Sequence, residues 1–310
     1  MKVAQIGYGH LGKWHAQKAK NVYGDNFVAI VEVDESRHEE ICKEYPSVKV
    51  TSDFDEIIND ISAAIIVTPT SFHFSILEKC LQNNLHVFCE KPLTETFNQS
   101  EKVKKLLTSR KDLKLQVGHS ERFHRCWGEL KDSLGNSEML RLTRRAPYKG
   151  RGADVDIVQD LMIHDFDLIN YFLEEVPLSI HASGKKIISN NYDYVSAHLT
   201  YKGNRSAFVT ASRVSTDEQR EVIAVLPEGE LKVDLLKNEI QRSNCFDGVF
   251  SLDSSSYEKS DHLLKEHEYF LKSITENVKP VIGIDDAITV MKMIDLTIKS
   301  LESGEIISWE

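Results

Sequence analysis

Apolar and polar positions follow two different patterns along the chain, and the change comes near residue 120. Up to that point, short apolar runs alternate with stretches of helical spacing, which is typical of a parallel sheet with crossover helices. The strands predicted in this part are 2–6, 27–31, 45–51, 63–68, 85–89 and 113–118. The helices predicted there follow the turn at 7–12 and cover 35–45, 54–59, 73–83 and 96–108. This pattern predicts a doubly wound Rossmann domain over residues 1–120, which binds its ligand at the carboxyl ends of the strands.

Beyond residue 121 the pattern changes to strands in succession. They are predicted at 139–146, 179–187, 195–201, 207–214 and 221–226, with helices at 158–173 and 262–275. The turn at 201–205 is typical of a hairpin, so we expect an antiparallel sheet in a second, α+β domain over 121–284. In the final segment, 285–310, residues Ile288, Met291, Ile294 and Ile298 form one apolar stripe of a helix.

Length, net charge and cysteine content exclude several classes of protein. The chain has 310 residues, more than one hydrophobic core usually serves, and a formal charge of −10, which argues against a nucleic-acid surface. No apolar run approaches the ~18 residues of a membrane span, and Met1-Lys2-Val3 enters a strand directly instead of a signal peptide. The five cysteines are scattered and show no metal-like grouping. We therefore expect a cytoplasmic protein with reduced thiols, no metal, no nucleic-acid partner and no membrane partner.

The first candidate site is the glycine turn Gly7-Tyr8-Gly9-His10-Leu11-Gly12, which lies between a strand and a helix. In this GxGxxG spacing Gly7 permits a tight turn, Gly9 lets the backbone approach a pyrophosphate, and Gly12 lets the helix pack closely on the strand. The helix that follows directs its free N–H groups at the anion. We therefore predict a dinucleotide site, with all six residues of the turn in contact with the cofactor.

The cofactor's ribose needs an acid just past the second strand, and two residues compete for that role. We assign Glu32 to the ribose hydroxyls and Asp34 to capping the helical stretch that follows. A carboxylate at this place repels a 2′-phosphate and favours NAD over NADP. Arg37 leaves NADP open, because a nearby arginine can accommodate that phosphate.

Two further segments carry catalytic chemistry. Lys91 follows directly on a strand, and Pro92 restricts its backbone, so its ammonium is placed to hydrogen-bond a substrate hydroxyl and lower its pKa. Asp160 and His164 are spaced i, i+4 on a predicted helix and share one face. An imidazole can take the hydroxyl proton while hydride leaves for a nicotinamide; a surface histidine and a pair of metal ligands are the alternatives.

Taken together, the turn GYGHLG, the EKP at 90–92 and DLMIHDFD at 160–167 resemble the glucose-fructose oxidoreductase / inositol dehydrogenase / MocA family over essentially the whole chain. The resemblance implies a Rossmann domain followed by an open, mostly antiparallel sheet, a face often used for oligomerisation as a homodimer or homotetramer, and a C-terminal helix that returns to the first domain. It implies that Glu90 and Lys91 contact the cofactor, that Lys91 also contacts substrate, and that His164 is the acid/base with Asp160 beside it. Further cofactor contacts are implied for Thr68, Pro69 and His73.

Residues 118–123 and 160–165 are similar to the branch of this family that oxidises UDP-N-acetylated sugars at C3. That branch usually continues RFNP, whereas this chain has Arg122-Phe123-His124-Arg125, so the substrate stays open. Arg122, Arg144 and Tyr148 are our candidates for substrate binding, and Arg145, Lys149 and Arg151 are further sources of positive charge.

We therefore expect an NAD-dependent oxidoreductase that oxidises a hydroxyl of a nucleotide sugar to a ketone. An inositol or simple-sugar dehydrogenase is the first alternative. A reductase of a non-sugar substrate and a non-enzymatic NAD-binding sensor are the others, and the joint presence of Lys91, Asp160 and His164 speaks against both.

Overall fold

The computed structural model describes residues 1–150 and 155–310 and divides the chain into two units. The first consists of Met1–Ser120 and Asp261–Ile288, and the second of Glu121–Ser260 and Thr289–Glu310. This differs from the expected second domain at 121–284 and from a segment 285–310 that returns to the first domain. The physical reason is burial: Phe270 is fully buried in the core of the first unit, whereas Ser300 accepts the Ala182 amide in the second.

A parallel sheet forms the centre of the first unit, as the apolar runs predict. Its order is β3-β2-β1-β4-β5-β6, and all neighbouring strands pair in parallel. The strands are β1 (Val3–Ile6), β2 (Phe27–Val31), β3 (Lys49–Thr51), β4 (Ala63–Ile66), β5 (His86–Glu90) and β6 (Leu115–Gly118). Strands such as β4 are buried at every position, which explains why their sequences show no polar alternation.

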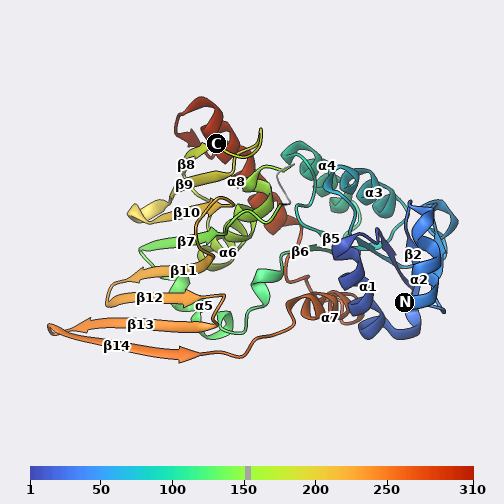
Figure 1. Cartoon of the computed structure of the whole chain (residues 1–310), viewed down its shortest axis with the longest axis horizontal. Coiled ribbons are helices and arrows are strands. Elements are labelled where there is room, and N and C mark those ends of the chain that lie inside the picture. Colours follow the sequence, from blue (N-terminus) through green and yellow to red (C-terminus); the bar gives the residue numbers. More distant parts are fainter. Residues whose placement is uncertain (151–154) are drawn as a thin grey trace. The chain divides into compact units, whose positions relative to one another are not determined.

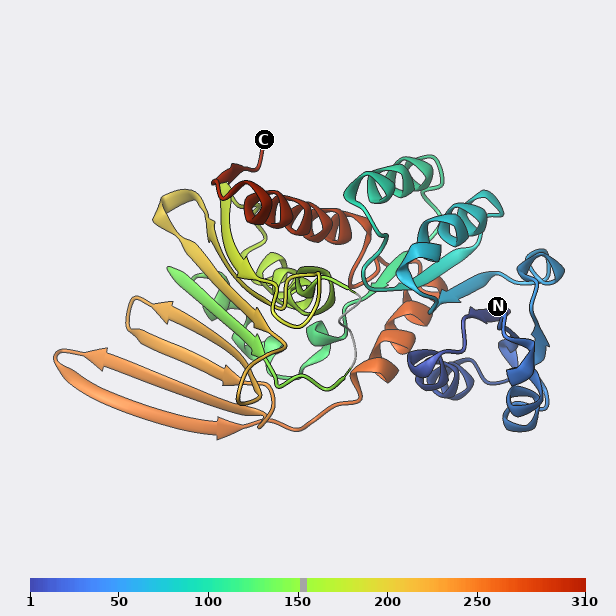
Figure 2. The same ribbon diagram turned by 45° about the horizontal axis from the view of Figure 1, so that its top comes forward.

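Helices lie on both faces of this sheet. In Figures 1 and 2, α3 and α4 lie side by side on one face, and α1 and α7 lie together on the other. The helices are α1 (His10–Tyr23), α2 (His38–Glu44), α3 (Thr70–Gln82), α4 (Phe97–Thr108) and α7 (His262–Thr275). The helix predicted at 54–59 is instead a single 3₁₀ turn, Phe54–Glu56, which Asp53 caps.

The second unit contains a mixed, mostly antiparallel sheet of nine strands in the order β14-β13-β12-β11-β7-β10-β9-β8-β15. Within this sheet, the β7–β10 pair is the only parallel one that the described residues form. The strands are β7 (Met139–Arg145), β8 (Ser179–Lys185), β9 (Tyr194–Thr200), β10 (Ser206–Ser212), β11 (Gln219–Leu226), β12 (Gly229–Asp234), β13 (Glu239–Phe246), β14 (Val249–Ser256) and β15 (Ile307–Ser308). Our predictions missed β12 to β15; β14, for example, is exposed along its whole length and therefore shows no apolar period.

Within the described residues, three α-helices accompany this sheet. They are α5 (Trp127–Gly135), α6 (Ile163–Leu173) and the greater part of α8 (Ile284–Ser303), which begins in the first unit. The single helix predicted at 158–173 starts with a π turn, Val158–Met162, and becomes α-helical only from Ile163. Sequence periodicity does not separate the two, because apolar side chains cover the core in both. No helix within the described part of the chain is both long and apolar enough to cross a membrane.

Candidate functional site

The glycine turn has the geometry that a pyrophosphate site requires. Gly7 has a φ of +96°, and a Cβ there would lie 2.5 Å from the Val67 carbonyl oxygen. A Cβ on Gly12 would lie 2.6 Å from the Gly7 oxygen, whereas one on Gly9 would meet nothing within 4 Å. The backbone is therefore closed behind Gly7 and Gly12 and open at Gly9, the position where we predict that the pyrophosphate approaches.

Two neighbouring features prepare this turn for an anionic cofactor. The buried Gln5 amide donates to the Gly7 and Gly12 carbonyl oxygens, at 2.8 Å each, and so fixes both ends of the turn. Helix α1 begins directly after Gly9 without a side-chain cap, so its first N–H groups keep the role of anion donors. The buried Thr68 hydroxyl also has no hydrogen-bond partner within 1–150 and 155–310, which fits a ligand that supplies one. These residues fit a dinucleotide.

Glu32 lies at the carboxyl end of β2, beside the turn. Its carboxylate accepts the Tyr8 amide at 2.9 Å and the Asp34 amide at 3.0 Å, and Arg37 lies 3.4 Å away. Asp34 caps the following 3₁₀ turn through the Ser36 amide, which confirms the capping role that we assigned to it. The contact of Glu32 with a ribose stays a prediction.

Tyr8 is placed differently from a ligand-binding side chain. Its ring is fully buried and its hydroxyl donates to Glu44 at 2.8 Å. Burial, with help from that hydrogen bond, raises the pKa of Tyr8 well above its usual value. Tyr8 therefore supports the turn from the core side, while His10 and Leu11, at the start of α1, are exposed.

His73 connects the two loops that follow β4 and β5. Its Nε2 lies 3.0 Å from the Thr68 carbonyl oxygen and its Nδ1 lies 2.8 Å from that of Pro92. The ring is almost completely buried, and burial lowers the pKa of His73 although both carbonyl oxygens oppose this. We therefore find His73 positioned to hold the loops carrying Thr68-Pro69 and Lys91-Pro92 together, the second of which contains a cis peptide bond.

Glu90 is buried inside the first unit, and its contact with the cofactor stays a prediction. One carboxylate oxygen lies 2.9 Å from His15 Nε2, and the other accepts the Lys91 amide at 3.0 Å. His15 Nδ1 in turn lies 3.0 Å from Nε2 of His267, a residue of α7 that stacks on Phe88. Helices α1 and α7 thus fix the backbone that carries Lys91.

Burial and hydrogen bonding shift the pKa values of Glu90 and His267, the two groups on either side of His15. Burial alone raises the pKa of Glu90, but the hydrogen bond and charge of His15, with Lys91, outweigh it and leave the pKa below its usual value. Burial holds the pKa of His267 well below 6.5, so this imidazole stays neutral. Glu90 is therefore ionised and accepts from His15 Nε2, while the neutral His267 ring lies at the other nitrogen of His15.

In the second unit, Asp160 lies within the π turn and His164 in the first turn of α6, both partly buried. π turns recur at functional sites, and this one directly precedes the candidate acid/base. Asp165 and Asp167, which follow His164 in α6, have buried carboxylates that pair with arginines. The helix is therefore tied down on the C-terminal side of His164.

Those partners are Arg122 and Arg144, two of our candidates for substrate binding. Arg122 forms a two-pronged pair with Asp167 at 2.7 and 2.8 Å. Arg144 lies 3.1 Å from Asp165, and both arginines are at most 7% exposed. The sequence does not show that these two side chains face the interior. Their burial does not support a contact with substrate, which stays a prediction.

The remaining candidates on β7 and the loop after it lie outside this cluster. Tyr148 is exposed, and Arg145 and Lys149 pair with Asp217 and Glu218. Arg151 lies outside the described residues.

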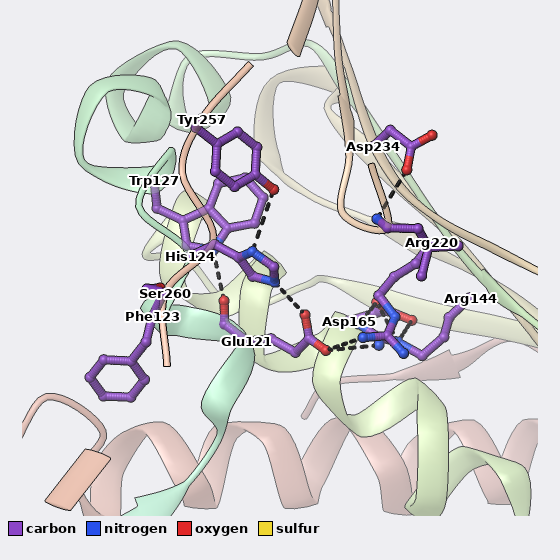
Figure 3. A network of polar contacts seen from close by, with 11 residues as sticks. Glu121, Phe123, His124, Trp127, Arg144, Asp165, Arg220, Asp234, Tyr257 and Ser260 are labelled. Carbon is purple, nitrogen blue, oxygen red and sulfur yellow. Dashed lines mark hydrogen bonds and ion pairs between the residues drawn. The ribbon is translucent and has the colours of Figure 1, made fainter. Parts of the chain in front are cut away.

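Glu121 is the centre of a buried polar cluster that the sequence analysis did not single out (Figure 3). Its Oε1 accepts from Arg144 at 3.0 Å and from Arg220 at 3.1 Å, and its Oε2 lies 3.0 Å from His124 Nε2. Burial alone raises the pKa of Glu121, but Arg144, the His124 hydrogen bond, Arg220 and His164 together hold that pKa well below its usual value. Glu121 is therefore ionised and close enough to His164 to interact with it electrostatically.

Comparison with family models identifies both units. Residues 1–119 match the model described as an oxidoreductase family with an NAD-binding Rossmann fold. Residues 136–232 match the GFO/IDH/MocA C-terminal domain.

Known proteins are similar over most of the chain. A UDP-N-acetylglucosamine 3-dehydrogenase of Acidithiobacillus ferrooxidans is 30% identical over 91% of this chain and 90% of its own. An inositol 2-dehydrogenase of Rhizobium meliloti is 26% identical over 98% and 97%. Among solved structures, the Acidithiobacillus ferrooxidans enzyme aligns with a TM-score of 0.90 over 98% of both chains, at 27% identity. The scyllo-inositol dehydrogenase of Lactobacillus casei with NAD(H) and scyllo-inositol has the same fold, with a TM-score of 0.83 and 21% identity over 100% and 99%.

The three glycines predict different effects of an added methyl group. Gly9→Ala keeps the thermal stability of the parent but weakens NAD binding at least about tenfold, because its Cβ enters the open side of the turn. Gly12→Ala is the matched control: its Cβ meets the Gly7 oxygen, so stability and binding fall together. Calorimetric titration with NAD and thermal unfolding measure both quantities. A Gly9→Ala protein that binds NAD as tightly as the parent contradicts this assignment.

The buried histidines predict a loss of stability in acid. His267 has its pKa lowered in the folded state, so its contribution is complete above 6.5 and is lost as the pH falls below that unfolded-state value. Each such group steepens the fall by up to about 1.4 kcal/mol per pH unit. His267→Gln, which does not titrate, therefore gives a shallower dependence of unfolding free energy on pH in urea denaturation.

His10→Gln is the control for this experiment, since it makes the same replacement at an exposed histidine at the start of α1. Equal slopes for His267→Gln and the parent below about pH 6.5 exclude a neutral, buried His267.

Proposed function

The chain belongs to the GFO/IDH/MocA oxidoreductase family, and from that premise we propose that it oxidises the C3 hydroxyl of a UDP-N-acetylglucosamine-like nucleotide sugar to a ketone. It is an NAD(P)-dependent oxidoreductase with an NAD-binding Rossmann domain.

One observation carries the choice of substrate. Over both units, the likeness to a UDP-N-acetylglucosamine 3-dehydrogenase has a TM-score of 0.90 at 27% identity, against 0.83 at 21% for the scyllo-inositol dehydrogenase. The second unit carries Asp160 and His164, and in a two-domain oxidoreductase the domain outside the Rossmann sheet is the one that distinguishes substrates.

Lys91 and His164 divide the chemistry of the hydroxyl. We assign to the Lys91 ammonium a hydrogen bond to the substrate oxygen, which stabilises the negative charge that develops there. His164 accepts the hydroxyl proton, and Asp160, one turn earlier, orients its imidazole. When bound, NAD accepts the hydride from the carbon that carries the hydroxyl. Together, the proton and the hydride carry away the two hydrogens and two electrons whose loss converts the alcohol to a ketone.

The first unit supplies the cofactor contacts in this proposal. The turn Gly7 to Gly12 faces the pyrophosphate, Glu32 accepts from the ribose, and Thr68 and Pro69 line the pocket together with Lys91. His73 and Glu90 act indirectly, since each holds the loop on which a contact residue lies.

Inositol oxidation is the second candidate. The similarity to the Rhizobium meliloti inositol 2-dehydrogenase covers 98% of this chain, and its chemistry at the reacting hydroxyl is the same. The two candidates differ in what surrounds the reacting ring: a nucleotide sugar needs partners for a diphosphate, and inositol does not.

Turnover with a panel of UDP-sugars, inositols and simple sugars tests the proposal through the absorbance of NADH. We expect activity with UDP-N-acetylglucosamine, and Lys91→Ala and His164→Ala each to lower kcat about 10²–10⁴-fold while NAD affinity is largely retained. Lys111→Ala, a change of an exposed lysine before β6, serves as control. Turnover of inositol but no UDP-sugar overturns the substrate, and near-normal kcat in both catalytic variants overturns the residue roles.

A further inference from the structure

Arg220 and Arg144 occupy paired positions on neighbouring strands of the second unit. In the antiparallel register of β7 and β11, Arg220 lies opposite Arg144. Both guanidinium groups reach the same oxygen of Glu121, at 3.1 and 3.0 Å, as the close view in Figure 3 shows. Like charges placed opposite each other are unfavourable, so the shared carboxylate is what allows the pair.

The two arginines differ in how much of their hydrogen-bonding capacity the protein uses. Arg144 is 4% exposed and divides its donors between Glu121 and Asp165. The side chain of Arg220 is 36% exposed, and its one ion pair within 1–150 and 155–310 is with Glu121, an oxygen it shares. A guanidinium has five N–H donors in a planar fork, so Arg220 retains donors for an outside oxyanion.

The surroundings of Arg220 favour an anion as the missing partner. Burial, followed by the charge of Arg144, lowers the pKa of Arg220, and Glu121, Asp165 and Glu218 oppose that shift only in part. Glu121 also forms hydrogen bonds with Arg144 and His124, so Arg220 has no carboxylate partner that it alone contacts. A further negative group at its exposed side strengthens the charge balance of the whole cluster.

This cluster lies close to the candidate acid/base. Asp165, which pairs with Arg144, directly follows His164 in α6. The carboxylate of Glu121 also interacts electrostatically with His164. Arg220 and His164 therefore both interact with the same carboxylate, that of Glu121, which places the exposed side of Arg220 in the neighbourhood of the candidate acid/base.

We propose that Arg220 binds an oxyanion of the substrate, a diphosphate or a sugar carboxylate, and selects charged sugars over neutral ones. This inference rests on the proposed function, since it names the residue that recognises the charged part of the substrate. It also replaces Arg122 and Arg144, whose donors the protein itself uses, as the source of that recognition.

Steady-state kinetics and binding of Arg220→Ala test the proposal in the full-length protein. We expect KM for UDP-N-acetylglucosamine to rise about 10- to 100-fold with kcat changed only a few-fold, because a charged hydrogen bond is lost from substrate binding. Arg220→Lys keeps the charge without the fork and recovers part of the loss. Arg141→Ala, on the exposed side of β7, is the matched control and leaves both constants unchanged.

Calorimetric titration of the NADH-loaded protein separates the two sources of the oxyanion. A loss of affinity for UDP in Arg220→Ala identifies the diphosphate, and a loss for glucuronate relative to glucose identifies the carboxylate. These titrations need no turnover, so they test Arg220 even if the parent oxidises no nucleotide sugar and the proposed function fails. Unchanged affinity for both ligands, or an equal loss for charged and neutral ligands in a normally folded variant, overturns the inference.

Discussion

The hydrogen bonds of one buried carboxylate, Glu90, are the constraint on which the first unit's site depends. An ionised carboxylate away from water is stable only when its oxygens are paired, and here His15 and the Lys91 amide provide the partners. His15 lies on α1, the helix that follows the glycine turn. The charge of the single carboxylate of Glu90 therefore connects this turn with the loop that carries Lys91. The position of Lys91 is thus set by groups that never touch the substrate.

The second unit uses the same principle around His164. Asp165 and Asp167 follow it on α6, and each is neutralised by an arginine from another segment. Glu121 adds a carboxylate that two arginines and His124 share. Breaking such pairs leaves a buried charge without a partner, which costs about 3–5 kcal/mol, so the helix that presents His164 has little freedom to move. Buried charge therefore serves positioning in both units.

Sequence pattern was sufficient for the parts of this molecule that depend on local spacing. Continuous apolar runs predicted the parallel sheet, and the glycine spacing predicted a turn whose openings and contacts the structure reproduces. Where burial leaves no periodic trace, as in the exposed strand β14, the prediction failed. The π turn before His164 also escaped it, because apolar residues face the core in either kind of helix.

Long-range partners were beyond the reach of the sequence. His15 and His267 are 252 positions apart, and Glu121 and Arg220 are 99 apart, so no local pattern connects them. For the same reason the sequence does not show that Arg122 and Arg144 pair with buried carboxylates, because a charged residue in a strand or turn does not reveal which face it occupies. The polar clusters that hold the candidate catalytic residues became visible only in three dimensions.

The proposed reaction transfers hydride from C3 of a nucleotide sugar to NAD. It is tested most directly with UDP-N-acetylglucosamine that carries deuterium at C3, followed by nuclear magnetic resonance of the reduced cofactor and the sugar product. We expect one deuterium at C4 of the nicotinamide ring and a ketone at C3 of the sugar. Reduced cofactor that contains only protium, or deuterium retained on the sugar, contradicts it.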